Sequence, residues 1–121
     1  MPATLRVEVF PAEIDRAVAF YTTLGFTVTR RHEGPPMRYA SMQYGQVRLG
    51  LAEREPADPA LRMLPIGTEI VVEVDDVRAE RDRVVAAGIP LLEDLVTREW
   101  GLTDFRLTDP DGFYWRFTSR T

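Results

Sequence analysis

Hydrophobic and polar residues follow strand, helix and strand patterns in turn through the first half of the chain. Apolar residues alternate with polar ones at positions 5–10, which is typical of a strand with one buried face. Over residues 12–24, apolar side chains recur at spacings of three and four, which predicts an amphipathic helix that ends at Gly25. Alternation then returns in three segments that we expect to be strands, namely 26–31, 37–44 and 46–52.

The same order of patterns returns in the second half, after a polar segment with three prolines. The prolines indicate a linker over residues 53–67 that contains a short helical turn. A strand and a helix follow, and Gly88, the residue expected to end this helix, lies 63 positions after Gly25. An Asp-Pro-Asp-Gly turn at 109–112 precedes the last strand. The predicted elements of this half are strands at 68–74, 102–108 and 113–118, one strand or two short pieces at 89–96, and a helix at about 76–87.

Two copies of one strand–helix–three-strand unit explain this repetition. One such unit would leave a face of its sheet uncovered, whereas two units can bury these faces together. We therefore predict an α+β fold of two tandem βαβββ units, with curled mixed sheets around a cleft and helices on the outside. Residues 1–121 are expected to form one domain, with units at 1–52 and 68–121 joined by the linker at 53–67.

Composition excludes several classes of function. The 121 residues carry 15 arginines, no lysine and 19 acidic side chains, and the net charge of −4 disfavours nucleic-acid binding. Without cysteine the chain forms no disulfide or thiolate metal site, and its one histidine, His32, rules out a site that needs two. No segment is apolar enough to span a membrane and the first ten residues do not form a signal peptide, so we expect a cytoplasmic protein.

Five short segments resemble the vicinal oxygen chelate superfamily, which contains glyoxalases, extradiol dioxygenases and bleomycin-resistance proteins. The first is Arg-Ala-Val-Ala-Phe-Tyr followed by Leu-Gly-Phe, at the end of the first predicted helix. The resemblance covers nearly the whole chain and implies the tandem βαβββ fold. The other four segments are Val-Asp-Asp-Val at 74–77, Ala-Gly-Ile at 87–89, Glu-Trp-Gly at 99–101 and Asp-Pro-Asp-Gly-Phe at 109–113.

The resemblance also implies where a metal would be held in the enzymes of this superfamily. The first and last strands of each half supply one ligand, which places the four positions at Arg6, Gly50, Glu69 and Arg116, with Leu49 as the other possibility for the second. Arginine carries no lone pair for a metal at accessible pH. A single carboxylate does not make a metal site. We therefore expect no metal and no cofactor.

Most of the predicted ligand-binding residues lie on the strand faces opposite the core, and Trp100 lies on a loop. Tryptophan and tyrosine provide flat surfaces for stacking, and the charged groups fix orientation. A shift in strand register would instead leave Arg6, Glu69 and Arg116 on the surface. Trp100 could also pack at a domain edge or dimer interface, and Tyr39 could be structural. The set is Arg6, Glu8, Phe10, Tyr39, Arg48, Glu69, Trp100, Tyr114 and Arg116.

No catalytic residue is predicted, because His32 has no identifiable orienting partner and is expected on the surface. The resemblance implies a metal-free homodimer of the bleomycin-resistance type, which sequesters a flat antibiotic without altering it. An acidic protein suits a cationic, bleomycin-like ligand, although Arg6, Arg48 and Arg116 would equally favour an acidic or phenolic one. The alternative is a glyoxalase- or dioxygenase-like enzyme, a lyase, isomerase or oxygenase, with an atypical or metal-independent site.

Overall fold

The chain folds as two units of the same topology, each with one α-helix and one four-stranded mixed sheet. The computed structural model describes residues 2–62 and 65–120. The first unit spans Met1–Asp58 and the second Pro59–Thr121. The order of elements in each is strand, helix and three strands, so the predicted tandem βαβββ fold is confirmed.

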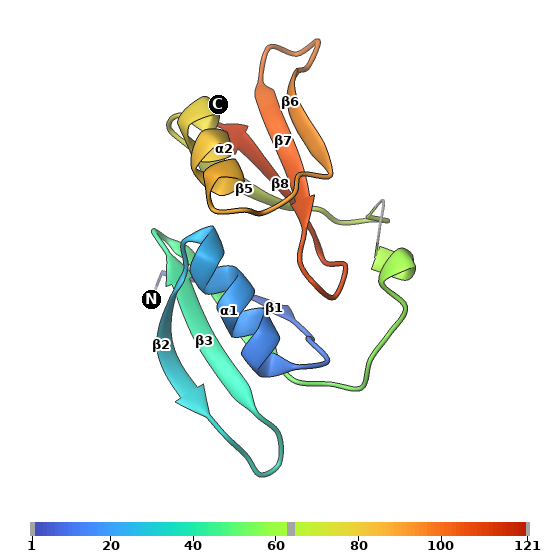
Figure 1. Ribbon diagram of the computed structural model, residues 1–121. Helices are drawn as coiled ribbons and strands as arrows, with labels where there is room; N and C mark the ends of the chain where they lie inside the picture. The colour runs from blue at the N-terminus through green and yellow to red at the C-terminus, as the bar shows by residue number, and fades with distance from the viewer. Residues whose placement is uncertain (1, 63–64, 121) are drawn as a thin grey trace. The chain divides into compact units, whose positions relative to one another are not determined.

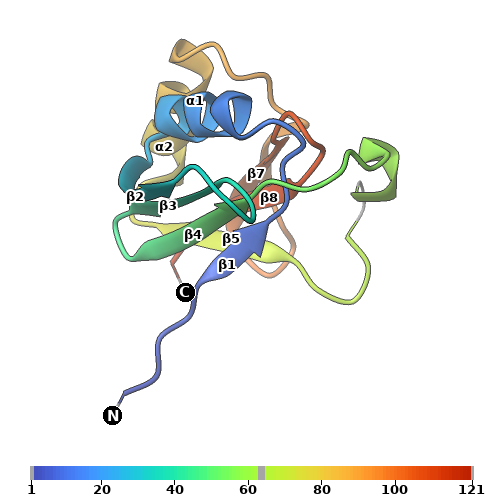
Figure 2. The same ribbon diagram turned by 90° about the horizontal axis from the view of Figure 1, so that it is seen from below.

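In the first unit, α1 lies along one face of its sheet (Figure 1). Strand order is β1-β4-β3-β2, with the β1–β4 pair parallel and the other pairs antiparallel (Figure 2). The first and last strands are therefore neighbours, and α1 lies on the crossover between β1 and the rest of the sheet. The elements are β1 (Val7–Val9), α1 (Ile14–Leu24), β2 (Thr27–His32), β3 (Tyr39–Tyr44) and β4 (Val47–Ala52).

The second unit repeats this arrangement with the order β5-β8-β7-β6. Here β5 and β8 form the parallel pair. The expected helical turn of the linker is a short 3₁₀ helix, η1 (Pro59–Arg62). Among the described residues, no helix has the length and apolar character needed to cross a membrane. The other elements are β5 (Ile70–Val74), α2 (Val77–Ala86), β6 (Glu93–Thr97), β7 (Thr103–Thr108) and β8 (Tyr114–Ser119).

The core of the first unit forms where the apolar stripe of α1 meets alternate residues of the sheet. Ile14 and Tyr21 on the helix are fully buried, as are Leu49 and Leu51 on β4. A residue far along the chain binds the start of this helix. Oε2 of Glu53 accepts a hydrogen bond from the Ile14 backbone N–H at 3.0 Å. This carboxylate satisfies one of the free N–H groups at the helix start and complements the helix dipole.

Aromatic side chains dominate the core of the second unit. Trp115, Phe105 and Phe117 are all fully buried, and the two phenylalanine rings stack with centroids 5.0 Å apart. The turn before β8 is held by Asp109, whose Oδ1 accepts hydrogen bonds from the backbone N–H groups of residues 111 and 113, each at 2.9 Å. Gly112 completes the turn with φ of 87°, a conformation that side chains disfavour.

Two details of the sequence prediction are wrong. The first strand was expected over residues 5–10, but β1 contains only Val7–Val9, because its parallel partner β4 pairs with those three residues alone. Leu5 is consequently 79% exposed. Val85 was expected in the buried stripe of α2 but is exposed, since it lies about 80° around the helix from Val77.

Replacing the buried tryptophan should destabilise the protein strongly. Trp115→Ala removes the largest fully buried side chain and should lower the free energy of unfolding by about 3–5 kcal/mol. Trp100→Ala is the matched control, because this tryptophan is 61% exposed and its removal should change stability little. Urea denaturation followed by circular dichroism measures both effects. Equal losses for the two variants would contradict this account of the core.

Candidate functional site

The face of the first sheet that points away from α1 is polar. Pairing across the four strands places Glu8 opposite Gly50, Gly50 opposite Ser41, and Ser41 opposite Arg30. Residues paired across a sheet project from the same face, so these four positions form one row. At its centre lie a glycine and a serine, and the space over the glycine is covered by the side chains of Tyr39 and Glu8.

A β-bulge in β2 brings Arg30 to this face. Val28 pairs with Met42, a core residue, whereas Arg30 pairs with Ser41 on the polar face. Strict alternation would put residues 28 and 30 on the same side of the strand. The irregularity between them inserts one extra residue and reverses the facing of those that follow.

A hollow of about 380 Å³ lies on this polar face. It brings together three residues predicted from the sequence, Arg6, Glu8 and Tyr39. It also contains residues that the sequence did not assign to a site, namely Arg30, His32 and Ser41. A neighbouring hollow of about 260 Å³ shares Arg6 and Arg30 and is also lined by Arg48, whose Nη1 donates to the Thr4 hydroxyl at 3.1 Å.

The three predicted residues form a connected polar group. The Arg6 guanidinium lies 2.9 Å from Oε2 of Glu8, and the Tyr39 hydroxyl donates a hydrogen bond to the same oxygen at 2.8 Å. Burial, and after it the hydrogen bond to Glu8, raises the pKa of the Tyr39 hydroxyl above its ordinary value. Tyr39 therefore stays protonated near neutral pH and acts as a donor to the carboxylate.

Tyr39 also explains the glycine at position 50. A Cβ atom on Gly50 would overlap the Tyr39 hydroxyl oxygen and would lie 3.0 Å from Cγ of Glu8. The space that a side chain would occupy at this position is therefore filled by the Tyr39–Glu8 pair.

On the second sheet, the equivalent position holds Arg116. Gly50 lies opposite the middle residue of β1, and Arg116 lies opposite Val71 in the corresponding parallel pair. The Arg116 guanidinium is 3.2 Å from Oε1 of Glu69, so these two predicted residues are also brought together. The same position of the repeat therefore carries a long cationic side chain in one unit and none in the other.

A buried carboxylate, Asp104, organises the rest of this second polar face. It is only 1% exposed and lies 2.8 Å from the Arg98 guanidinium. Hydrogen bonds to Asp104 and then Glu93 raise the pKa of Arg98 further above its ordinary value. Arg106 donates to the Tyr114 hydroxyl at 2.6 Å. Sequence analysis missed this network, although the alternation of polar and apolar residues along β7 could have indicated it.

Trp100 and Phe10 lie apart from these groups, and two residues already placed in them also line a hollow of their own. Trp100 lies on the turn between β6 and β7 and exposes 61% of its surface. Phe10 packs beneath the Arg54 guanidinium, whose carbon is 5.2 Å from the ring centre. Tyr114 and Glu69 line a separate hollow of about 260 Å³ in the second unit, beside η1.

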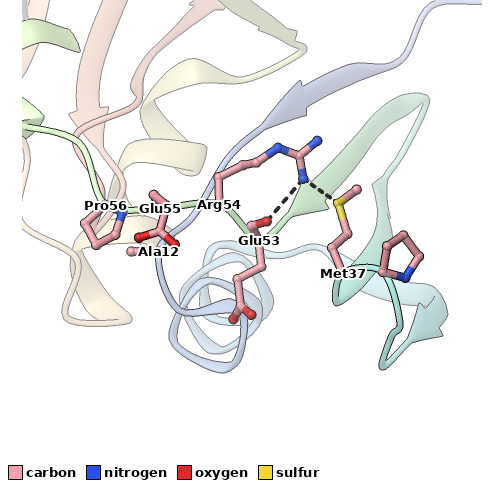
Figure 3. Close-up of a pocket in the computed structure, with 7 residues that line it drawn as sticks. Ala12, Met37, Glu53, Arg54, Glu55 and Pro56 are labelled. Atoms are coloured by element: carbon pink, nitrogen blue, oxygen red, sulfur yellow. Dashed lines mark hydrogen bonds between the residues drawn. The ribbon is translucent and has the colours of Figure 1, made fainter.

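Another hollow, of about 450 Å³, lies near the start of α1 in the first unit (Figure 3). Arg54 projects into it and contacts the Met37 sulfur, while its Nη1 donates to the Glu53 carbonyl at 3.2 Å. The Glu53 carboxylate is engaged by the helix N-terminus. Because these polar groups serve the local structure and none of the predicted site residues lines this hollow, we assign it no ligand.

A family model for the glyoxalase/bleomycin resistance protein/dioxygenase superfamily matches residues 4–117. The chain belongs to this superfamily. The match spans both units, in agreement with the resemblance seen in the sequence. A search of curated protein sequences found no match.

Solved structures of the superfamily fold are similar over nearly the full chain. A bleomycin-binding protein complexed with bleomycin is 23% identical, with a TM-score of 0.80 and coverage of 99% of this chain and 100% of that one. A bleomycin resistance determinant from transposon Tn5 is 22% identical, with a TM-score of 0.79 and 98% coverage of both. A glyoxalase family protein from Enterococcus faecalis is 18% identical, with a TM-score of 0.74 and coverage of 96% and 94%. These identities establish the fold alone.

The residues at the superfamily's metal positions do not fit a divalent ion in either unit. Arg6 and Arg116 are cationic and each is paired with a carboxylate, and the space beside Gly50 is filled by Tyr39. Guanidinium groups offer no lone pair and repel a cation. In the described part of the chain, no three histidine, cysteine or acidic side chains are grouped as a metal would require. We derive no chemical step through a metal.

Adding a methyl group at position 50 should disrupt the Tyr39–Glu8 pair. Gly50→Ala should lower the free energy of unfolding by about 1–3 kcal/mol through overcrowding. Tyr39→Phe removes the crowding oxygen, so the same glycine substitution should cost less in that background. A double-mutant cycle measured by urea denaturation gives the coupling. Additive effects of the two substitutions would contradict the steric link between these residues.

Proposed function

We propose that this protein is a metal-free, non-catalytic small-molecule-binding protein of the bleomycin-resistance type. It sequesters a flat aromatic ligand, and residues 1–121 act as one domain. The ligand cleft is completed by a second copy of the chain, and the protein works in the cytoplasm. Its role is to hold a toxic or reactive natural product, such as an antibiotic, away from its target.

One observation carries this proposal, namely the chemistry at the superfamily's metal positions. Position 50 has no side chain, and position 116 has an arginine engaged with Glu69. Polar groups that remain on these faces can orient a ligand by hydrogen bonds and charge. They offer no activated nucleophile or identified acid–base pair. The likeness of the fold to bleomycin-binding proteins agrees with a binding role.

Trp100 supports a flat ligand. Its indole exposes 61% of its surface, so a ring face is available for stacking. The turn that carries it, between β6 and β7, is closed by a hydrogen bond from the Gly101 N–H to the Arg98 carbonyl at 2.9 Å. The Arg98 side chain is itself bound to Asp104, and this ion pair holds the turn that carries the tryptophan.

Removing Trp100 should weaken ligand binding without unfolding the protein. With bleomycin as the probe, Trp100→Ala should reduce the binding free energy by about 0.5–1.5 kcal/mol through loss of stacking. Leu92→Ala is the control, since Leu92 is another exposed apolar side chain of the second unit and offers no aromatic face. Isothermal titration and tryptophan fluorescence report the binding. A panel of flat antibiotics that leaves the fluorescence of Trp100 unchanged would contradict the proposal, as would one equivalent of divalent metal retained after dialysis.

The proposed assembly is a homodimer. Among the described strands, β1 pairs with β4 alone and forms an edge of its sheet, and such edges are commonly covered by another chain. Light scattering after size-exclusion chromatography should give about twice the 13.8 kDa chain mass at micromolar concentration. A monomer mass that persists on concentrating the sample would count against the shared cleft.

A further inference from the structure

The hollow on the polar face of the first sheet is built differently from the equivalent place on the second. Its lining includes Ser41, the small cross-strand partner of Arg30, whereas the neighbouring Gly50 is covered by the Tyr39 hydroxyl and the Glu8 side chain. In the second unit, the corresponding row places Arg116 opposite Arg106, so that long side chains cover the same area. A small side chain at the Ser41 position is therefore a property of the first unit.

Charge is distributed unevenly between the units and within the first one. The first unit has seven arginines and seven acidic residues, whereas the second has eight arginines and twelve acidic residues and accounts for the whole net charge of −4. Of the seven acidic residues of the first unit, only Glu8 lines the hollow. Asp15 and Glu33 are bound instead to Arg31 and Arg38, outside the hollow.

Arg30 supplies a positive charge at the hollow that no described carboxylate neutralises. Glu8 is engaged by Arg6 at 2.9 Å and by the Tyr39 hydroxyl. Arg30 lies three strand spacings from Glu8 along the row, about 14 Å at a typical spacing of about 4.8 Å. Between them lies Ser41, which is the cross-strand partner of Arg30 and also lines the hollow.

We propose that this hollow receives an anionic oxygen group, a carboxylate or phenolate, on the flat ligand that the protein sequesters. The inference rests on the proposed function and specifies its ligand class. A volume of about 380 Å³ suits a ring-sized group, and a guanidinium donates paired hydrogen bonds to a carboxylate. A cationic group would be repelled by Arg30 and would find Glu8 already occupied by Arg6 and Tyr39. The overall acidity of the chain is thus a poor guide to the charge of its ligand.

Three molecules of the same shape and different charge test the inference: benzoate, benzamide and benzamidine. Each is titrated at low ionic strength into the full-length, ¹⁵N-labelled protein, and affinities are taken from shifts of backbone amides in β2 and β3 and of arginine Nε–H signals. Benzoate should bind about tenfold more tightly than benzamide, because hydrogen bonds to charged groups are the stronger ones. Benzamidine should bind most weakly of the three.

Arg30→Gln should reduce the affinity for benzoate to that for benzamide and leave the benzamide affinity unchanged. Arg78→Gln is the matched control, because Arg78 is an exposed arginine on α2 in the other unit. Its effect on all three affinities should be negligible. The inference is overturned if benzamidine binds as tightly as benzoate, if benzoate shifts no signal in β2 or β3, or if Arg30→Gln leaves its affinity unchanged.

Failure of this inference can be told from failure of the proposed function. Binding of bleomycin that depends on Trp100, together with equal binding of the three benzene derivatives, would remove the anion site and keep the binding role. If neither bleomycin nor any flat antibiotic binds, and benzoate causes no shift, both fall. Charge-dependent binding of benzoate with one tightly held metal ion per chain would keep the anion site and remove the metal-free role.

Discussion

Parallel pairing between the first and last strands of each unit is the constraint on which the rest of this structure depends. A parallel pair cannot be joined by a tight turn, so the chain must cross over through a helix before it returns. In the first unit this requirement puts α1 across one face of the sheet and fixes which strand residues contact it. The pairing also sets the register that places Glu8 beside Gly50, and Val71 beside Arg116.

Once the register is fixed, the polar faces of the two sheets can diverge while both cores stay similar. The first unit has the Tyr39–Glu8 pair over Gly50 at the centre of its polar face, and at the edge Arg30, which no described carboxylate neutralises. The second has a buried aspartate surrounded by arginines, which fills the same area with ion pairs. Neither arrangement disturbs the helix on the opposite side, because adjacent strand residues project in opposite directions.

The fold could be predicted because it depends on periodicity, which is visible in a single sequence. Ile14 and Tyr21 follow the helical spacing, and Leu49 and Leu51 the strand spacing, so their burial was expected. The group of Arg6, Glu8 and Tyr39 was also anticipated as part of the ligand-binding set. Arg30 was not anticipated, because the side of the sheet on which it lies depends on a β-bulge. A bulge reverses the alternation of the strand, and no residue type in this strand indicates it. Alternation along β7 puts Asp104 on the polar face of its sheet, but its burial depends on Arg98 and Arg116, which only the fold brings near it.

The contrast between positions 50 and 116 affects how readily this protein could change its chemistry during evolution. At position 116 a single codon change can exchange one long polar side chain for another, because the space for it already exists. At position 50 any new side chain is blocked until the Tyr39 hydroxyl has moved, so a useful mutation there depends on an earlier one in β3. The second half of this repeat can therefore accept a new side chain at this position more readily than the first. New functions are expected to arise first in the second half.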